Sequence, residues 1–92
     1  MEKKRLTLAA IKQALEETQY PSVWKKAQSM PDEEFCKMNF RDDFDMDSLD
    51  IIELTLCLDR NNGVCIPEKA VSEFSRHGGT VQAMLDAYNQ NF

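Results

Sequence analysis

The sequence predicts an all-α protein, a small four-helix bundle with a long loop between its first and second helices. Apolar residues recur at helical spacing in four segments. Only three glycines and three prolines interrupt the 92 residues, and no alternation typical of β-strands is sustained. A chain of this length is expected to form one domain, over residues 1–92.

The first helix is expected over residues 6–19, where apolar residues recur every three or four positions. Pro21 is expected to end it, because proline cannot continue a helix. A long loop is then expected over residues 20–47. Within this loop, Pro31 followed by three acidic residues is typical of a helix start, and the sequence leaves a short helix there open.

Three further helices follow the loop. The clearest is expected over residues 48–60, because Asp47 and Ser48 at its start are cap-type residues and Asn61-Asn62-Gly63 tolerates the positive φ of a helix end. The third is expected over residues 67–76, with a proline in its first turn. Thr80 is expected to cap the fourth.

The second helix carries too many apolar residues for one buried face. At 100° per residue they form two separate stripes, which are Ile51, Leu54 and Leu58 on one side and Leu49, Ile52 and Leu56 on the other. One stripe can face the core. The other is either exposed to receive a partner or buried in a second contact, and periodicity alone leaves both open.

The acidity of the protein is concentrated in residues 42–59, here called the acidic segment. The net charge is −5, and none of the 11 basic residues lies in this segment. Its acidic residues are Asp42, Asp43, Asp45, Asp47, Asp50, Glu53 and Asp59. Carboxylates crowded together attract the basic side chains of other proteins and repel the phosphates of nucleic acids. We therefore expect basic proteins as partners and no nucleic acid.

The acidic segment in part resembles a calcium-binding loop. Asp43, Asp45 and Asp47 fit the first three ligand positions of an EF-hand. The sixth position, which should be glycine, is Ser48, and the twelfth, which should be glutamate, is Leu54. We therefore predict no metal site.

The cysteines indicate reduced thiols. Cys36, Cys57 and Cys65 form no Cys-x-x-Cys pair, and the single histidine, His77, cannot complete a zinc cluster. The apolar run at residues 6–11 is too short for a signal peptide, and no stretch approaches the roughly 18 apolar residues of a membrane span. We expect a cytoplasmic monomer with no membrane span.

Three landmarks together resemble the acyl carrier protein family. An acidic loop leads into Asp47-Ser48-Leu49, with the serine opening the second helix. Ile66-Pro67-Glu68 resembles the start of the family's third helix, and Thr80-Val81-Gln82-Ala83 the start of the fourth. The resemblance covers residues 40–92 and is compatible with the first helix.

The resemblance implies a carrier and not an enzyme. A phosphopantetheinyl transferase would attach 4′-phosphopantetheine from coenzyme A to the Ser48 hydroxyl, beside Asp47, and the thiol would hold acyl groups as thioesters. A phosphodiester at a helix start would meet free backbone N–H groups and a positive dipole end. The plain alternative is that Ser48 is only an N-cap. His77 lies far along the chain, so activation of the hydroxyl must come from the transferase.

The family also implies roles for two sets of residues. Docking to the transferase and to acyl-transferring or synthase enzymes with basic patches would fall to Leu49, Asp50, Ile52, Glu53, Leu56 and Asp59. Packing, and with it the lining of an acyl pocket, would fall to Phe40, Phe44, Leu54, Leu58, Ile66, Val71 and Phe74.

The sequence also departs from the family pattern. Asp45-Met46 stands where the family has Gly-Ala, and the loop over residues 20–47 is several residues longer than usual. The resemblance implies a role in fatty-acid, polyketide or specialised lipid biosynthesis, and these departures favour a specialised pathway over housekeeping fatty-acid synthesis. Two alternatives stay open, a peptidyl or aminoacyl carrier of a nonribosomal pathway and an unmodified carrier-like adaptor subunit.

Overall fold

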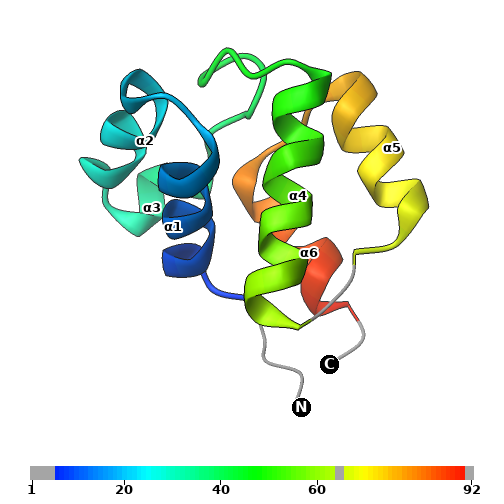
Figure 1. Ribbon diagram of the computed structural model, residues 1–92. Helices are drawn as coiled ribbons and strands as arrows, with labels where there is room; N and C mark the ends of the chain where they lie inside the picture. The colour runs from blue at the N-terminus through cyan, green and yellow to red at the C-terminus, as the bar shows by residue number, and fades with distance from the viewer. Residues whose placement is uncertain (1–5, 64–65, 91–92) are drawn as a thin grey trace.

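The computed structural model describes residues 6–63 and 66–90, which form six α-helices (Figure 1). They are α1 (Leu8–Thr18), α2 (Pro21–Gln28), α3 (Asp32–Phe35), α4 (Ser48–Asn62), α5 (Glu68–His77) and α6 (Val81–Asn89). These described residues contain no strand, although an isolated antiparallel bridge pairs Asn39 with Thr80. The prediction of an all-α protein is thereby confirmed.

Helix α4 lies between α1 and α5 and organises the core (Figure 1). One of its two apolar stripes, Ile51, Leu54 and Leu58, is fully buried. The core around this stripe includes large side chains from α1, α3, the loop before α4, α5 and α6, among them Ile11, Leu15, Phe35, Phe40, Phe74, Val81 and Met84. Burial of these apolar side chains is the main contribution to the stability of so short a chain.

The ends of the helices follow the capping residues in the sequence. Asp47 is the N-cap of α4, and Gly63 ends that helix with φ of 65°, a left-handed conformation that glycine adopts without strain. Thr80 caps α6 by accepting a hydrogen bond from the N–H of Ala83 at 3.1 Å. Helix α5 begins one residue later than expected, with Pro67 as its N-cap.

The expectation of a continuous loop over residues 20–47 is wrong for part of its length. Pro21 does not merely end the first helix, because it also occupies the first position of α2, where its missing N–H needs no partner. The short helix that the sequence left open is present as α3, with Pro31 as its N-cap. Lys26 of α2 donates to the backbone carbonyl of Asp43 at 2.6 Å, which joins α2 to the start of the acidic segment.

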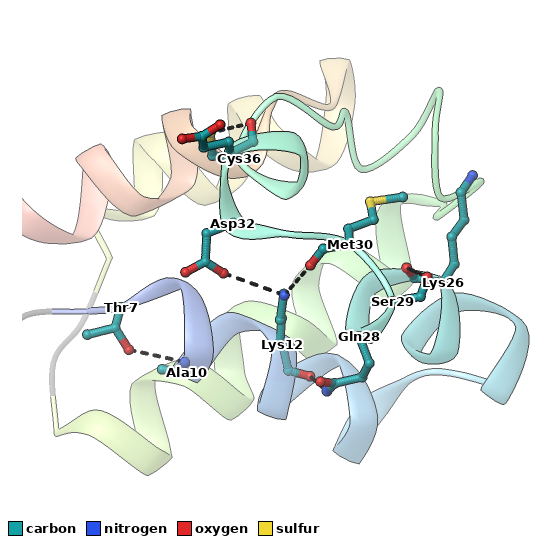
Figure 2. Close-up of polar contacts among 10 residues, drawn as sticks. Thr7, Ala10, Lys12, Lys26, Gln28, Ser29, Met30, Asp32 and Cys36 are labelled. Carbon is teal, nitrogen blue, oxygen red and sulfur yellow. Dashed lines mark hydrogen bonds and ion pairs between the residues drawn. The ribbon is translucent and has the colours of Figure 1, made fainter.

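A lysine from α1 connects the core to the segment that contains α2 and α3 (Figure 2). The Lys12 ammonium donates to the carbonyl of Met30 at 2.7 Å and pairs with Asp32 at 3.5 Å. It also lies 5.2 Å from the ring centre of the buried Phe35. The start of α3 is therefore fixed by a half-buried cation as well as by apolar packing.

Cys36 and Cys57 are free thiols, and Cys65 lies outside the described residues. The Cys57 thiol is buried and donates to the Glu17 carboxylate at 3.4 Å. Burial is the largest cause that raises the pKa of the Cys57 thiol. Within residues 6–63 and 66–90, no helix has the length and apolar character needed to cross a membrane.

Candidate functional site

Ser48 is the first residue of α4, and its side chain is exposed. Asp47 caps the helix by accepting from the N–H of Asp50 at 2.9 Å, and the Asp50 carboxylate accepts from the N–H of Asp47 at 3.2 Å. This reciprocal cap leaves the Ser48 hydroxyl without a capping role. The plain N-cap alternative for Ser48 is therefore wrong.

The Ser48 hydroxyl faces the C-terminal end of α5. It donates a hydrogen bond to the carbonyl of Ser75 at 2.7 Å and accepts one from Nη2 of Arg41 at 3.3 Å. Nη1 of Arg41 donates in turn to the carbonyl of Arg76 at 2.7 Å. Neither a peptide carbonyl nor a guanidinium can remove the hydroxyl proton. Within the described part of the chain, no general base contacts Ser48.

The loop before Ser48 turns its acidic side chains outward and its apolar ones inward. Phe44 and Met46 are buried, while Asp45 between them and Asp47 after them are exposed. Asp45 has φ of 55°, in the left-handed region that glycine favours and aspartate tolerates.

Four carboxylates of the acidic segment have partners inside the fold. Asp47 and Asp50 form the cap, and Asp43 accepts from the N–H of Asn39 at 2.6 Å. Asp59 accepts from the Tyr88 hydroxyl at 2.7 Å and from the N–H of Ile66 at 3.4 Å.

The other three carboxylates are free to attract a partner. In residues 6–63 and 66–90, no group donates a hydrogen bond to the side chains of Asp42, Asp45 or Glu53, and all three are exposed. In the same residues, no three metal-ligating side chains are grouped to hold an ion.

Asp59 differs from the other carboxylates because it is partly buried. Desolvation by burial is the largest effect and raises the pKa of the Asp59 carboxyl, while the hydrogen bonds from Tyr88 and Ile66 lower it. The docking role expected for Asp59 stays a prediction, and the structure gives this side chain an internal partner as well.

The second apolar stripe of α4 is on the outside of the molecule. Leu49 is 63% exposed and Leu56 is 60% exposed, while Ile52 between them is half-buried. The question that periodicity left open is thus answered, since one stripe is core and the other is accessible. We call Leu49, Ile52 and Leu56 the exposed stripe.

The seven acyl-pocket candidates lie in the core or against it. Six are buried, and Val71 is half-buried beside them. One of the seven, Phe74, also lines a pocket of about 270 Å³ at the junction of α5 and α6. The other lining residues are Glu73, His77, Gly78, Gly79 and Ala83. Packing in the core is confirmed, whereas the lining of an acyl pocket stays a prediction.

Two features of the site escaped the sequence reasoning, namely Arg41 and the pocket at the α5–α6 junction. Arg41 immediately precedes the seven acidic residues and lies seven positions before Ser48, which was the available signal. Gly78 and Gly79, which lie just before the start of α6, line part of the pocket.

The chain was compared with protein families, curated proteins and solved structures. No family model matches it, and neither the curated proteins nor the solved structures yielded a match.

Proposed function

We propose that this protein is a carrier that bears 4′-phosphopantetheine on Ser48 and shuttles acyl or related thioesters between enzymes of fatty-acid, polyketide or specialised lipid biosynthesis. One observation carries the proposal. The Ser48 hydroxyl is exposed on the first residue of α4, the cap of that helix is supplied by Asp47 instead, and the exposed stripe begins at the next residue.

The residues around Ser48 fit a phosphodiester. The backbone N–H groups of Ser48 and Leu49 have no acceptor among the described residues, as is usual in the first turn of a helix. Their partial positive charge and the Arg41 guanidinium favour an anion there despite the nearby carboxylates. When bound, the group supplies a flexible arm with a terminal thiol that holds the cargo.

The helical architecture is compatible with a carrier bundle. In this proposal α1, α4, α5 and α6 are the four helices of the bundle, and α2 and α3 elaborate the long connection between the first two. The left-handed backbone at Asp45 supports the same proposal, because it occurs where the family has glycine.

Partner enzymes would recognise α4. The exposed stripe offers apolar area, and Glu53 next to it is an exposed carboxylate with no bond inside the described chain. A phosphopantetheinyl transferase or a synthase with a basic patch around an apolar centre complements this surface. Because no general base among the described residues forms a hydrogen bond with the Ser48 hydroxyl, we expect the transferase to supply one.

Intact-protein mass measurement tests the proposal. The protein is incubated with coenzyme A, magnesium and a broad-specificity transferase, and we expect a gain of one phosphopantetheine that Ser48→Ala abolishes. Ser22→Ala is the matched control, because Ser22 is also exposed in the first turn of a helix but lies outside the acidic segment. No gain with several transferases would contradict the proposal and favour the adaptor alternative.

A further inference from the structure

Arg41 connects the start of α4 to the end of α5. Its two terminal nitrogens reach different helices, Nη1 to the carbonyl of Arg76 at 2.7 Å and Nη2 to the hydroxyl of Ser48 at 3.3 Å. A guanidinium has five donors in a rigid fork, so these two bonds leave further donors available.

The position of Arg41 is fixed by its neighbours. Its backbone N–H donates to the Asn39 side chain at 2.9 Å. Its aliphatic stem passes so close to Gly78 that a Cβ added there would lie 2.8 Å from Cγ of Arg41. Gly78 also has φ of 74°, so glycine is needed at this point for its backbone as well as for its small size.

The positive charge of Arg41 has no internal counter-ion. Across residues 6–63 and 66–90, no carboxylate lies within ion-pair distance of its guanidinium, although Arg41 directly precedes the acidic segment. A cation held in place beside an exposed hydroxyl, with donors to spare, is suited to bind an anion attached to that hydroxyl.

Modification changes the bonding of Ser48 in a defined way. Its Oγ forms a bond to the phosphorus of the pantetheine phosphate, the pyrophosphate bond of coenzyme A breaks, and 3′,5′-ADP leaves while the transferase takes the hydroxyl proton. The resulting ester oxygen can no longer donate to the carbonyl of Ser75. One negative charge is added to a segment that already carries seven.

We infer that Arg41 binds the phosphodiester carried on Ser48 and, through its bond to Arg76, keeps α5 joined to α4 after modification. The inference rests on the proposed function. Arg41 is then a positioning residue, because it compensates the new charge and retains a link to α5 when Ser48 loses its bond to Ser75.

The test compares melting temperatures before and after modification in the full chain. For the wild type we expect modification to change the melting temperature little. For Arg41→Gln we expect an additional fall of about 4 °C on modification. This additional fall should shrink as salt rises, because repulsion between the phosphodiester and the exposed carboxylates is screened. The difference between modified and unmodified protein separates this role from contacts that Arg41 makes in both forms.

Two further variants sharpen the test. Arg60→Gln removes the same charge from the far end of α4, where the side chain is exposed, and should behave as the wild type does. Arg41→Lys keeps the positive charge, but a lysine ammonium lacks the planar guanidinium whose two terminal nitrogens bond to different helices. Should Arg41→Gln fail to fold, the ³¹P resonance of the phosphodiester should differ between wild type and Arg41→Lys and be unchanged in Arg60→Gln.

The outcomes are distinguishable. If the wild type gains no mass with any transferase, the carrier proposal fails and the role of Arg41 fails with it. If wild type and Arg41→Gln both gain mass but modification changes their melting temperatures equally, or if the ³¹P resonance is the same in wild type and Arg41→Lys, only the role of Arg41 is overturned.

Discussion

The backbone carbonyl of Ser75, in the last turn of α5, accepts a 2.7 Å hydrogen bond from the Ser48 hydroxyl at the start of α4. The atom proposed for modification is thus part of the contact between two helices. Helix α5 is attached at this end by Ser48 and Arg41 and also packs against α4. Any change at Ser48 is therefore expected to alter stability as well as modification.

We predict that Ser48→Ala lowers the free energy of unfolding of the unmodified protein by about 0.5–1.5 kcal/mol, the usual net worth of one hydrogen bond. Urea denaturation of the two proteins measures it. Ser22→Ala, which breaks no side-chain hydrogen bond in the described structure, should stay within about 0.5 kcal/mol of the wild type. Equal stability of Ser48→Ala and wild type would show that the bond to Ser75 contributes nothing.

A leucine-to-alanine substitution should affect stability very differently in the two apolar stripes of α4. Leu58→Ala should cost about 2–5 kcal/mol of stability, because Leu58 is fully buried and its loss leaves a cavity. Leu56→Ala should change stability by about 0.5 kcal/mol or less, because Leu56 is 60% exposed. In the proposed function it should instead slow modification by the transferase. A normal rate of modification would mean that the exposed stripe is not used by this partner.

The sequence predicted the elements whose ends are fixed by local chemistry. The start of α4 at Ser48, its end near Gly63 and the cap of α6 at Thr80 all follow from residue types whose backbone or side-chain preferences act within one turn. Helix α2 escaped because Pro21 serves both to end one helix and to open the next, and its eight residues bury only Ala27. Contacts distant in sequence support this helix, because Val23 and Trp24 pack against the core and Lys26 donates to the carbonyl of Asp43.

The site was predictable only where it is local. Ser48, its cap and the two stripes share one helix, so periodicity and capping rules place them. Arg41 reaches Ser48 and Arg76 through space, and the bond from Ser48 to Ser75 joins residues 27 positions apart. Such contacts depend on how α5 packs on α4, which no local pattern in the sequence encodes.

The left-handed residue in the acidic loop gives a third prediction. Asp45→Ala should destabilise the protein by up to about 1 kcal/mol, because alanine keeps the Cβ that crowds the backbone at φ of 55° and adopts this left-handed region less readily than aspartate does. Asp45→Gly should be neutral or stabilising by up to about 1 kcal/mol. Denaturation of both variants measures the effect. If both substitutions changed stability equally, the loop would not require a left-handed residue at this position.

Asp59 gives a prediction about pH. Burial raises the pKa of its carboxyl, so the folded protein binds this proton at a higher pH than the unfolded chain does. The relevant pH window lies between the pKa of Asp59 in the unfolded chain, about 3.9, and its higher pKa in the folded protein. Within this window the folded state binds more protons than the unfolded state, so the free energy of unfolding falls as pH rises. Asp59→Asn removes this titration while keeping an acceptor for Tyr88.

Unfolding free energies measured from acidic to neutral pH therefore decide the Asp59 prediction. The stability of Asp59→Asn relative to wild type should improve as pH rises through the window. Asp42→Asn is the control for the loss of one exposed carboxylate. A relative stability that is flat, or that worsens as pH rises, would show that burial of the charged Asp59 carboxylate does not oppose folding.

The last prediction concerns attraction of the transferase by the acidic segment. Glu53→Lys reverses an exposed charge beside the exposed stripe and should slow modification of Ser48 about threefold or more at low salt, because a basic docking patch is then repelled. The deficit should shrink as salt rises, since exposed charges are screened over about 10 Å at 0.1 M. Glu16→Lys makes the same change on the exposed face of α1 and should leave the rate almost unchanged. A Glu53→Lys deficit that persists at high salt would mean that this side chain contacts the transferase sterically and does not attract it from a distance.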